Sequence, residues 1–247
     1  LLAPYDPYAL VGPPFSKTSS EFWLGTNDIG QDILSEIIWG TRVSLTVGIV
    51  AGFLAALGGL LAGVGAGYFG GKLDGLLMRM VDVVLVIPFL PLMILLGSFI
   101  GPSLSTLIIV ISVTAWAAPA RVIRSQTLSV KQDDYVHAAR AIGARERHMI
   151  TRHIVPGVLP LSLALFVSAT SAAILTEAAL SFLGLGDPTV KSWGTILQFA
   201  QARGAFFTGS WIWWVIPPGL CITAATVGFA LIGFVVEEVL DPRLGRP

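Results

Sequence analysis

Residues 43–71, VSLTVGIVAGFLAALGGLLAGVGAGYFGG, contain no charged side chain. A helix needs about 20 apolar residues to cross the hydrocarbon core of a bilayer, so this stretch predicts a membrane-spanning helix. Its glycines recur four residues apart, at Gly48 and Gly52 and again at Gly59, Gly63 and Gly67. Glycines at this spacing let two helix backbones approach closely in lipid, so we interpret them as a helix–helix seam. General use of glycine in membrane spans is the alternative.

The whole chain has the composition of a membrane protein. Hydrophobic residues make up 54% and charged residues 12% of its 247 residues, and the mean hydropathy is +0.80. These values lie far outside those of soluble domains. The single cysteine, Cys221, excludes an internal disulfide and lies in an apolar run, where a packed thiol is expected. The formal net charge is zero and indicates no partner, and we expect no nucleic acid among the partners.

Four more apolar segments predict further spans at residues 76–99, 104–120, 158–182 and 212–236. We therefore expect an all-α polytopic membrane protein with five transmembrane helices. Pro88 and Pro91 should break the helix in the second span, because proline removes a backbone donor and clashes with the preceding turn. Asp82 in that span is a candidate functional residue, since ionisable groups in spans are costly. Arg79 lies within one turn of it and favours an ion pair at the helix end.

Residues 133–160, DDYVHAARAIGARERHMITRHIVPGVLP, form the longest strongly charged stretch. We expect a helix over 135–142, preceded by two carboxylates that suit the positive end of a helix. Gly143 should end this helix in a left-handed conformation, and a second helix over 144–154 should end at Pro156 and Pro160. Alanines leave the first helix with few bulky side chains, so that it could enter a groove on a partner. An ordinary basic cytoplasmic loop is the alternative.

Residues 1–41 are polar and rich in proline, and we expect an extracytoplasmic segment ahead of a transmembrane domain at 42–247. Within the segment, Asp28 should cap a short amphipathic helix, with Gln31 as the partner in a capping box. The apolar face of this helix would consist of Ile33, Leu34, Ile37 and Ile38. Such a helix is expected to lie at the membrane surface, with or without a role in substrate handling.

Positive charge is distributed unequally between the two sides that five spans define. One side carries Lys72, Arg79, Arg121, Arg124, Lys131, Arg140, Arg145, Arg147, Arg152, Arg243 and Arg246. The other side carries Lys17, Arg42, Lys191 and Arg203. The positive-inside rule makes the first side cytoplasmic, together with the 131–156 loop and the C-terminus. Residue 1 then lies outside, so we expect one further span ahead of it.

The charged stretch resembles the EAA loop in membrane subunits of ATP-binding-cassette importers. That loop reads Glu-Ala-Ala, three residues, Gly, nine residues and Ile-x-Leu-Pro. This sequence has His137-Ala138-Ala139, then Gly143, and HIVP at residues 153–156. The Ala-Ala pair, the glycine and the proline match at the family spacing, while histidine replaces the glutamate.

Other motifs resemble the dipeptide, oligopeptide and nickel branch of the same family. They are EAALSFLGLG at residues 177–186, SWG at 192–194 and DPRL at 241–244. Residues 24–36, LGTNDIGQDILSE, resemble the branch pattern LGTDxxGRDxxSR. Asn27, Gln31 and Glu36 depart from that pattern.

The resemblance implies the membrane subunit of an importer in a bacterial or archaeal plasma membrane, with no catalytic residues of its own. Its partners would be a second homologous membrane subunit, two cytoplasmic ATPase subunits and an extracytoplasmic substrate-binding protein. The ATPase subunits would bind ATP and magnesium, and this chain would bind no cofactor or metal. Di- or oligopeptides are the implied substrates, with nickel and oligosaccharides as alternatives.

Glu177 and Asp82, as ionisable residues within predicted spans, are candidate gating or structural residues. The resemblance assigns a further set to docking. The residues expected to dock on an ATPase subunit are Tyr135, His137, Ala138, Ala139, Ile142, Gly143, Ala144 and Pro156.

Several activities find no support in the sequence. No phosphate-binding G-x-x-x-x-G-K-[ST] loop occurs, so the chain should not hydrolyse ATP by itself. The three histidines lack metal-ligand spacing to a carboxylate, and we expect them to be solvated or to dock. An ion-coupled carrier or channel is the rival interpretation, but it would carry acids or bases at mid-membrane, and Asp82 and Glu177 lie toward span ends. An intramembrane hydrolase would need a nucleophile and base motif, which the sequence lacks.

Overall fold

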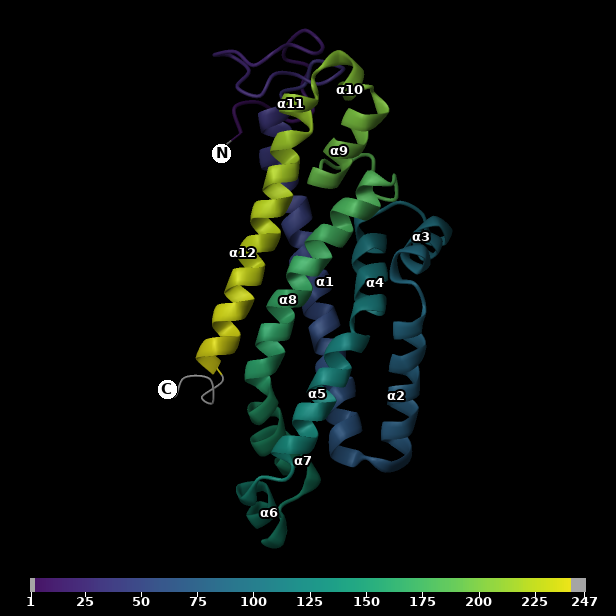
Figure 1. The fold of residues 1–247 in the computed structure, drawn as a ribbon, viewed down its shortest axis with the longest axis vertical. Coiled ribbons are helices and arrows are strands. Elements are labelled where there is room, and N and C mark those ends of the chain that lie inside the picture. The colour runs from purple at the N-terminus through teal and green to yellow at the C-terminus, as the bar shows by residue number, and fades with distance from the viewer. Residues whose placement is uncertain (1–2, 241–247) are drawn as a thin grey trace. The chain divides into compact units, whose positions relative to one another are not determined.

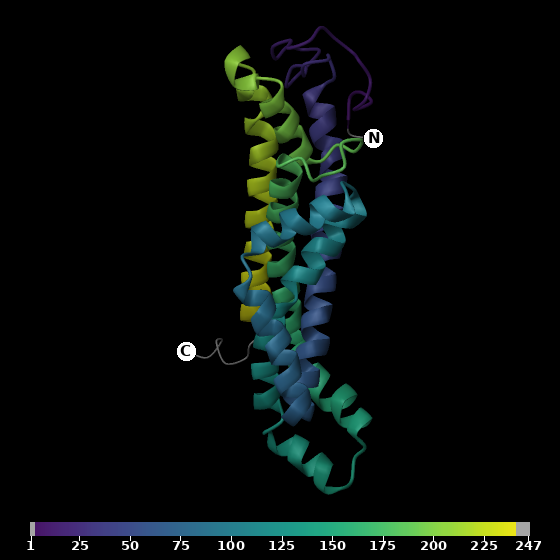
Figure 2. The same ribbon diagram turned by 90° about the vertical axis from the view of Figure 1, so that its right-hand side faces the viewer.

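The computed structural model describes residues 3–240, which form helices joined by loops (Figures 1 and 2). Within these residues, the only β pairing is an isolated bridge between Thr26 and Asp32. The helices are α1 (Ile33–Phe69), α2 (Gly71–Val86), α3 (Phe89–Ile100), α4 (Leu104–Ala115), α5 (Ala117–Val130), α6 (Asp134–Ala141), α7 (Glu146–Met149), the π-helical η1 (Ile150–Ile154), α8 (Val155–Phe182), α9 (Trp193–Ala202), α10 (Ala205–Thr208), α11 (Trp211–Trp214) and α12 (Ile216–Leu240). The DPRL motif lies outside the described residues.

The expected five spans are present when each bent helix pair counts as one. Among residues 3–240, three continuous segments are long and apolar enough to cross a membrane: Ile33–Phe69, Glu146–Phe182 and Trp211–Glu238. The pair α2 and α3 is bent by 91°, and the pair α4 and α5 by 40°. Ile87, between α2 and α3, has extended backbone angles because the residue before Pro88 avoids the helical region. Pro91 falls in the first turn of α3, where proline is tolerated.

The start of α1 corrects the expectation of a separate amphipathic helix. No break separates the predicted surface helix from the first span, and α1 is continuous over 37 residues. Asp32 rather than Asp28 occupies the cap position, since its Oδ2 accepts a hydrogen bond from the Ser35 backbone N–H at 2.9 Å. The preceding chain is held in a tight turn, with Gly30 at φ 88° and the Asn27 N–H donating to the Gln31 carbonyl at 3.0 Å. The helix therefore cannot begin earlier.

The charged loop also differs from its expected boundaries. Its second helix does not end at Pro156 or Pro160 but continues through η1 into α8, so that Pro160 lies inside a helix. A π-helical turn ends at Ile154, two residues before Pro156. Its wider spacing gives the proline ring room that an α-helical turn would deny. The third span is likewise longer than expected, because α5 continues to Val130.

The chain divides into two compact units. Unit 1 comprises Leu1–Val50, Met93–Val110 and Ser171–Gly228, and unit 2 comprises Ala51–Leu92, Ile111–Thr170 and Phe229–Pro247. Among the described residues, unit 2 carries nine of the thirteen lysines and arginines. These nine all belong to the side that charge distribution predicted to be cytoplasmic. The main core of unit 2 consists of Val64, Tyr68, Ile123, Val130, Val136, Met149, Ile154 and Val158.

The glycines of α1 form the predicted seam. In unit 2, a Cβ atom on Gly63 would lie 2.7 Å from the Ala120 carbonyl oxygen and 2.8 Å from Ile123 Cβ, both on α5. Gly59 and Gly67 approach α5 as closely, and Gly52 faces the backbone of Thr170 on α8. In unit 1, Gly48 meets Ile174 of α8. Only glycine permits these backbone distances.

Replacing Gly63 with alanine should lower the stability of the fold by about 1–3 kcal/mol, because the added methyl group would push α1 away from α5. Gly65→Ala is the matched control, since its Cβ would meet only Leu77 Cδ1 at 3.8 Å. Thermal unfolding of the purified protein in detergent would compare the two. Equal midpoints for both variants would contradict a seam at Gly63.

Candidate docking loop and buried polar sites

Helix α6 of the charged loop has an inner and an outer face. On the inner face, Val136 is 1% exposed, and Ala139 and Ala144 pack against the core of unit 2. On the outer face, Ile142 is 87% exposed, and a Cβ atom added to Gly143 would meet no other atom within 4 Å. The other exposed members of the predicted docking set are Tyr135, His137, Ala138 and Pro156. The predicted set therefore divides into anchoring residues and residues available to a partner.

Gly143 ends α6 in the way the sequence predicts. Its φ of 81° is left-handed. The Gly143 N–H donates to the Arg140 carbonyl at 3.0 Å, and the Ala144 N–H donates to the Ala139 carbonyl at 3.1 Å. These two bonds form a Schellman motif, and the apolar contact that accompanies it brings Ala139 and Ala144 to the same core. The turn is thus fixed both by hydrogen bonds and by packing.

Side chains tie the loop to the end of α1. The Tyr68 hydroxyl donates to a carboxylate oxygen of Glu146, at the start of α7. The Lys131 ammonium donates to the Tyr68 carbonyl at 2.6 Å, from the end of α5. Burial, followed by the nearby Asp133 carboxylate, raises the pKa of the Tyr135 phenol, so Tyr135 remains a neutral donor on the loop at physiological pH. A displacement of the loop would be transmitted to α1 and α5 through these bonds.

Asp82 forms an ion pair, but its partner differs from the expected one. Its Oδ1 lies 2.6 Å from Arg121 Nη2 on α5, rather than against Arg79, and both side chains are about half exposed at 52% and 55%. Asp74 on α2 similarly accepts two bonds from Arg124 on α5, at 2.5 and 2.6 Å. Because α2 packs along α5, these cross-helix partners replace the one on the same helix. The geometry gives Asp82 a structural contact.

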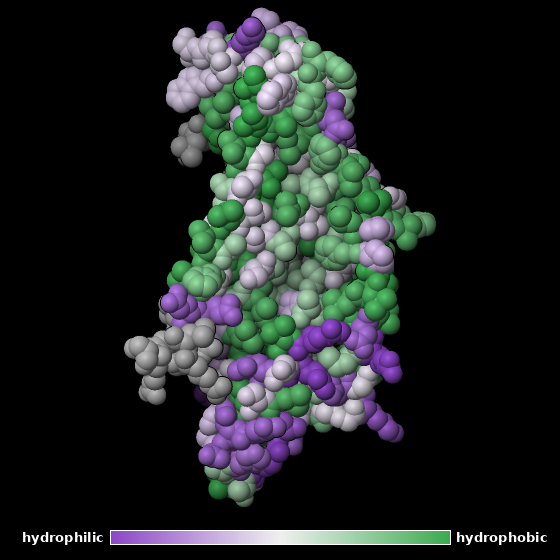
Figure 3. All heavy atoms as spheres, in the orientation of Figure 1, coloured by the Kyte–Doolittle hydropathy of each residue, from purple (hydrophilic) through white to green (hydrophobic). Residues whose placement is uncertain are grey.

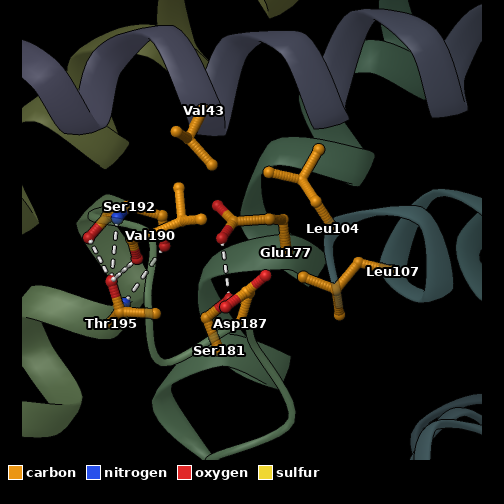
Figure 4. A pocket seen from close by; sticks show the side chains of 9 residues that line it. All are labelled: Val43, Leu104, Leu107, Glu177, Ser181, Asp187, Val190, Ser192 and Thr195. Atoms are coloured by element: carbon orange, nitrogen blue, oxygen red, sulfur yellow. Dashed lines mark hydrogen bonds between the residues drawn. The ribbon is translucent and has the colours of Figure 1, made fainter. Parts of the chain in front are cut away.

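Glu177 is fully buried in unit 1 and is held by hydroxyl groups (Figure 4). Ser44 Oγ on α1 donates to its Oε2 at 2.8 Å, and Ser181 Oγ donates to its Oε1 at 2.7 Å. The Trp193 backbone N–H, at the start of α9, donates to Ser44 Oγ at 3.2 Å. A small recess beside the carboxylate is lined by Val43, Leu104, Leu107, Glu177, Ser181, Asp187, Val190, Ser192 and Thr195.

Two stretches that the sequence analysis singled out separately meet around Glu177. A Cβ on Gly194 would lie 2.6 Å from the Ala178 carbonyl oxygen, so the EAALSFLGLG and SWG motifs pack directly on each other. Ser192 caps α9 by accepting from the Thr195 N–H at 3.1 Å, in a complete capping box. Trp193 Nε1 donates to the Ile37 carbonyl at 3.2 Å. The Glu177 carboxylate therefore joins α1, α8 and α9.

Replacing the Glu177 carboxylate with an amide in Glu177→Gln should be strongly coupled to Ser44→Ala, because both changes alter the same Ser44–Glu177 hydrogen bond. A double-mutant cycle on unfolding free energy should give a coupling of about 0.5–3 kcal/mol. Each single change should destabilise the protein by about 1–3 kcal/mol, since a buried polar partner loses its bond. Simple additivity of the two changes would show that the Ser44–Glu177 contact contributes nothing.

A second buried polar cluster was missed by sequence reasoning. Lys191 Nζ donates to Glu36 Oε1 at 2.6 Å and to Gln31 Oε1 at 2.8 Å. Asn27 Nδ2 donates to the same two oxygens, each at 2.9 Å. The Lys191 ammonium also lies 5.8 and 5.7 Å from the ring centroids of Tyr8 and Phe199.

The cluster consists of Lys191 and all three residues that depart from the branch pattern in 24–36. Three departures within one short motif were the available signal. Lys191, 155 residues from Glu36 in the sequence, could not be assigned to them without the fold. Asp28, expected to cap a helix, instead pairs with Arg203 at 3.2 Å.

Breaking the Glu36–Lys191 pair from one side should destabilise unit 1 strongly, because the remaining charge would be buried alone. The side chains are only 2% and 13% exposed, and Glu36→Gln or Lys191→Met should each remove about 3–5 kcal/mol of stability. The double variant should be more stable than the Lys191→Met single variant, since it leaves no unpaired carboxylate. Unfolding measurements on the three variants test this, and a double variant as unstable as the sum of the singles would refute it.

The helices and these sites define a multi-pass membrane protein whose charged loop presents an exposed helix. Residues 59–246 match the family described as binding-protein-dependent transport system inner membrane component, and the chain belongs to this family. Within the described residues, no three His, Cys, Asp or Glu side chains gather into a set that could hold a metal ion.

Relatives in several bacteria are at least 34% identical to this chain over the aligned residues. The dipeptide transport system permease protein DppC of Haemophilus influenzae is 36% identical over 251 residues, covering 98% of this chain and 84% of that protein. DppC and the oligopeptide transport system permease protein OppC of Bacillus subtilis are each 34% identical over 229 residues, which is 92% of this chain and 71% and 74% of those proteins.

Solved structures confirm the fold. A chain of the inward-facing MetNI methionine ABC transporter superposes with a TM-score of 0.62 at 19% identity, covering 81% of this chain and 95% of that chain. A chain of an amino acid ABC transporter solved with histidines gives 0.56 at 17% identity, covering 84% and 93%. The all-α membrane fold expected from the sequence is therefore shown.

Proposed function

We propose that this chain forms half of the translocation path of an ATP-driven importer of short peptides, and that α6 receives movement from a cytoplasmic ATPase subunit. The observation that carries the proposal is the construction of α6. One of its faces is exposed up to Ile142 and Gly143, while the other is locked to the core through Val136 and a Schellman turn. A helix anchored in this way can pass a displacement from a partner to the core without detaching from it.

The attachments of the loop support its role in transmitting movement. Tyr68 on α1 bonds Glu146 on α7, and Lys131 at the end of α5 bonds the carbonyl of Tyr68. A displacement of α6 would tilt these helices together, as in alternating exposure of a path to the two sides. ATP binding by the ATPase subunits would supply the displacement.

Charge supports the orientation that this mechanism needs. Unit 2, which contains the loop, carries nine described lysines and arginines against four in unit 1. The positive-inside rule then favours a cytoplasmic loop and C-terminus in a bacterial or archaeal plasma membrane. The extracytoplasmic binding protein would dock on the opposite side, and a second homologous membrane subunit would complete the path.

The names of the relatives support peptides as the substrate class, since those described above are dipeptide and oligopeptide permeases. ATP and magnesium would be held by the ATPase subunits rather than by this chain. The two candidate acids disfavour an ion-coupled carrier, because both already have partners within the chain. Asp82 forms an ion pair with Arg121, and Glu177 accepts hydrogen bonds from two serine hydroxyls.

Cysteine cross-linking in native membranes tests the docking role, after Cys221→Ser removes the natural thiol. Ala138→Cys lies on the exposed face of α6 and should capture an ATPase subunit. Ala139→Cys is the matched control, because the neighbouring position packs against the core and should cross-link far more weakly.

Uptake measurements in vesicles made from the same membranes separate this function from its rival, an ion-coupled carrier. Peptide uptake should require ATP and stop when the Ala138 cross-link forms. Uptake that persists without ATP and without any captured subunit would replace the importer by an ion-coupled carrier.

A further inference from the structure

The start of α7 and η1 presents a concentration of positive charge that the docking role does not use. An open recess of about 520 Å³ is lined by Arg145, Arg147, His148, Thr151 and Arg152. All five side chains are exposed. Their polar groups are three guanidinium groups, an imidazole and a hydroxyl, which is a set dominated by hydrogen-bond donors. Figure 3 shows hydrophilic residues gathered where α6 and α7 lie.

The recess lacks counter-charge from the chain around it. Over the 131–156 loop the sequence has five lysines and arginines and three carboxylates, for a formal charge of 5 − 3 = +2. Glu146 is engaged by the Tyr68 hydroxyl. Among residues 3–240, none of the ion pairs involves Arg145, Arg147 or Arg152. Three neighbouring guanidinium groups repel one another, so an external anion would stabilise the arrangement.

The helix beneath the arginines is held firmly enough to keep them together. Met149 and Ile154 on the opposite face are 1% and 0% exposed and belong to the core of unit 2. Thr151 Oγ1 donates to the Arg147 carbonyl at 2.9 Å, and the rings of His148 and His153 meet edge to face at 5.6 Å. The recess is therefore built on a fixed helix face.

Along the same helix face, the arginines are followed by exposed apolar side chains. Leu159 and Leu163 follow Arg152 by seven and eleven residues, a spacing that repeats one face of a helix, and they are 42% and 46% exposed. Pro156, between them and Arg152, is exposed as well. At 1.5 Å per residue, Arg152 and Leu163 lie roughly 16 Å apart along the axis. That is about half of the 30 Å hydrocarbon core, the depth of one leaflet.

We propose that this recess binds the phosphate of an anionic phospholipid, with the acyl chains of the lipid lying along Leu159 and Leu163. Guanidinium groups bind phosphate oxygens through paired, charge-assisted hydrogen bonds, and clusters of basic residues at the end of a span attract anionic lipids. An acidic protein surface could satisfy the arginines too, but it would make no use of the leucine stripe within the membrane span. The site does not depend on the docking role of α6.

Lipid binding by the purified full-length chain in detergent tests the proposal. Native mass spectrometry would measure the retention of phosphatidylglycerol against phosphatidylcholine. The chain should retain phosphatidylglycerol at least fivefold better, and Arg147→Gln/Arg152→Gln should abolish that preference. Lys72→Gln/Arg79→Gln is the matched control, because it removes two exposed cations from unit 2 outside the recess, and it should change the preference less than twofold.

Two further arms identify the source of the phosphate and the part played by the acyl chain. Glycerol phosphate at the same concentration should compete poorly, because it lacks hydrocarbon to place on the leucines. Leu159→Ser/Leu163→Ser should weaken retention while keeping all three arginines. Circular dichroism and unfolding midpoints would confirm that each variant remains folded.

Several results would overturn the proposal. Equal loss of phosphatidylglycerol in Arg147→Gln/Arg152→Gln and in Lys72→Gln/Arg79→Gln would show that the lipid is attracted by the overall positive charge of unit 2 rather than by the recess. Competition by glycerol phosphate as strong as that of the lipid would show a site for soluble phosphates. Unchanged lipid retention in Arg147→Gln/Arg152→Gln, with loss of the ATPase subunits from the co-purified complex, would assign the arginines to a protein surface.

Discussion

The close contact between the glycines of α1 and the neighbouring helices is the constraint on which the rest of the structure depends. In lipid, apolar side chains gain little by leaving one hydrocarbon environment for another, so helices associate through tight packing and internal hydrogen bonds. Gly59, Gly63 and Gly67 bring α1 against the backbone of α5. That approach places Tyr68, at the end of α1, within reach of Lys131 and Glu146. The attachment of the charged loop is thus a consequence of the glycine seam.

Polar groups in unit 1 depend on the same kind of approach. Gly40 has the Ser192 backbone 3.2 Å from its Cβ position, and this proximity allows the Trp193 N–H to reach Ser44. Ser44 in turn binds Glu177, so the carboxylate is satisfied by hydroxyls rather than by a cation. The Glu36 carboxylate, by contrast, accepts hydrogen bonds from the Lys191 ammonium and from the Asn27 side-chain amide. Each arrangement supplies hydrogen-bond donors to a buried carboxylate, which offsets part of the cost of its burial.

Sequence reasoning was accurate where a local rule decides the outcome. The absence of charge in 43–71 predicted a span, Pro88 predicted a bend, and the spacing in the charged loop predicted a helix that ends at Gly143. It was wrong where neighbours compete for a residue. Asp82 forms its ion pair with Arg121 on another helix rather than with Arg79. Asp32, not Asp28, caps the start of α1. Pro156 failed to end a helix because the π-helical turn before it makes room for the ring, and Pro160 lies inside α8.

The sequence by itself determined the membrane class, the five apolar spans, the glycine seam and the family of this protein, because hydrophobicity, glycine spacing and short motifs are properties of contiguous residues. Only the tertiary structure decided which polar groups meet. Lys191 and Glu36 lie 155 residues apart, and Ser44 and Glu177 lie 133 residues apart. It also decided which residues of the predicted docking set face outward, since Ala138 and Ala139 are alike in sequence and differ only in the neighbours that folding gives them. Pairings over such separations depend on the packing of whole helices, which no local pattern encodes.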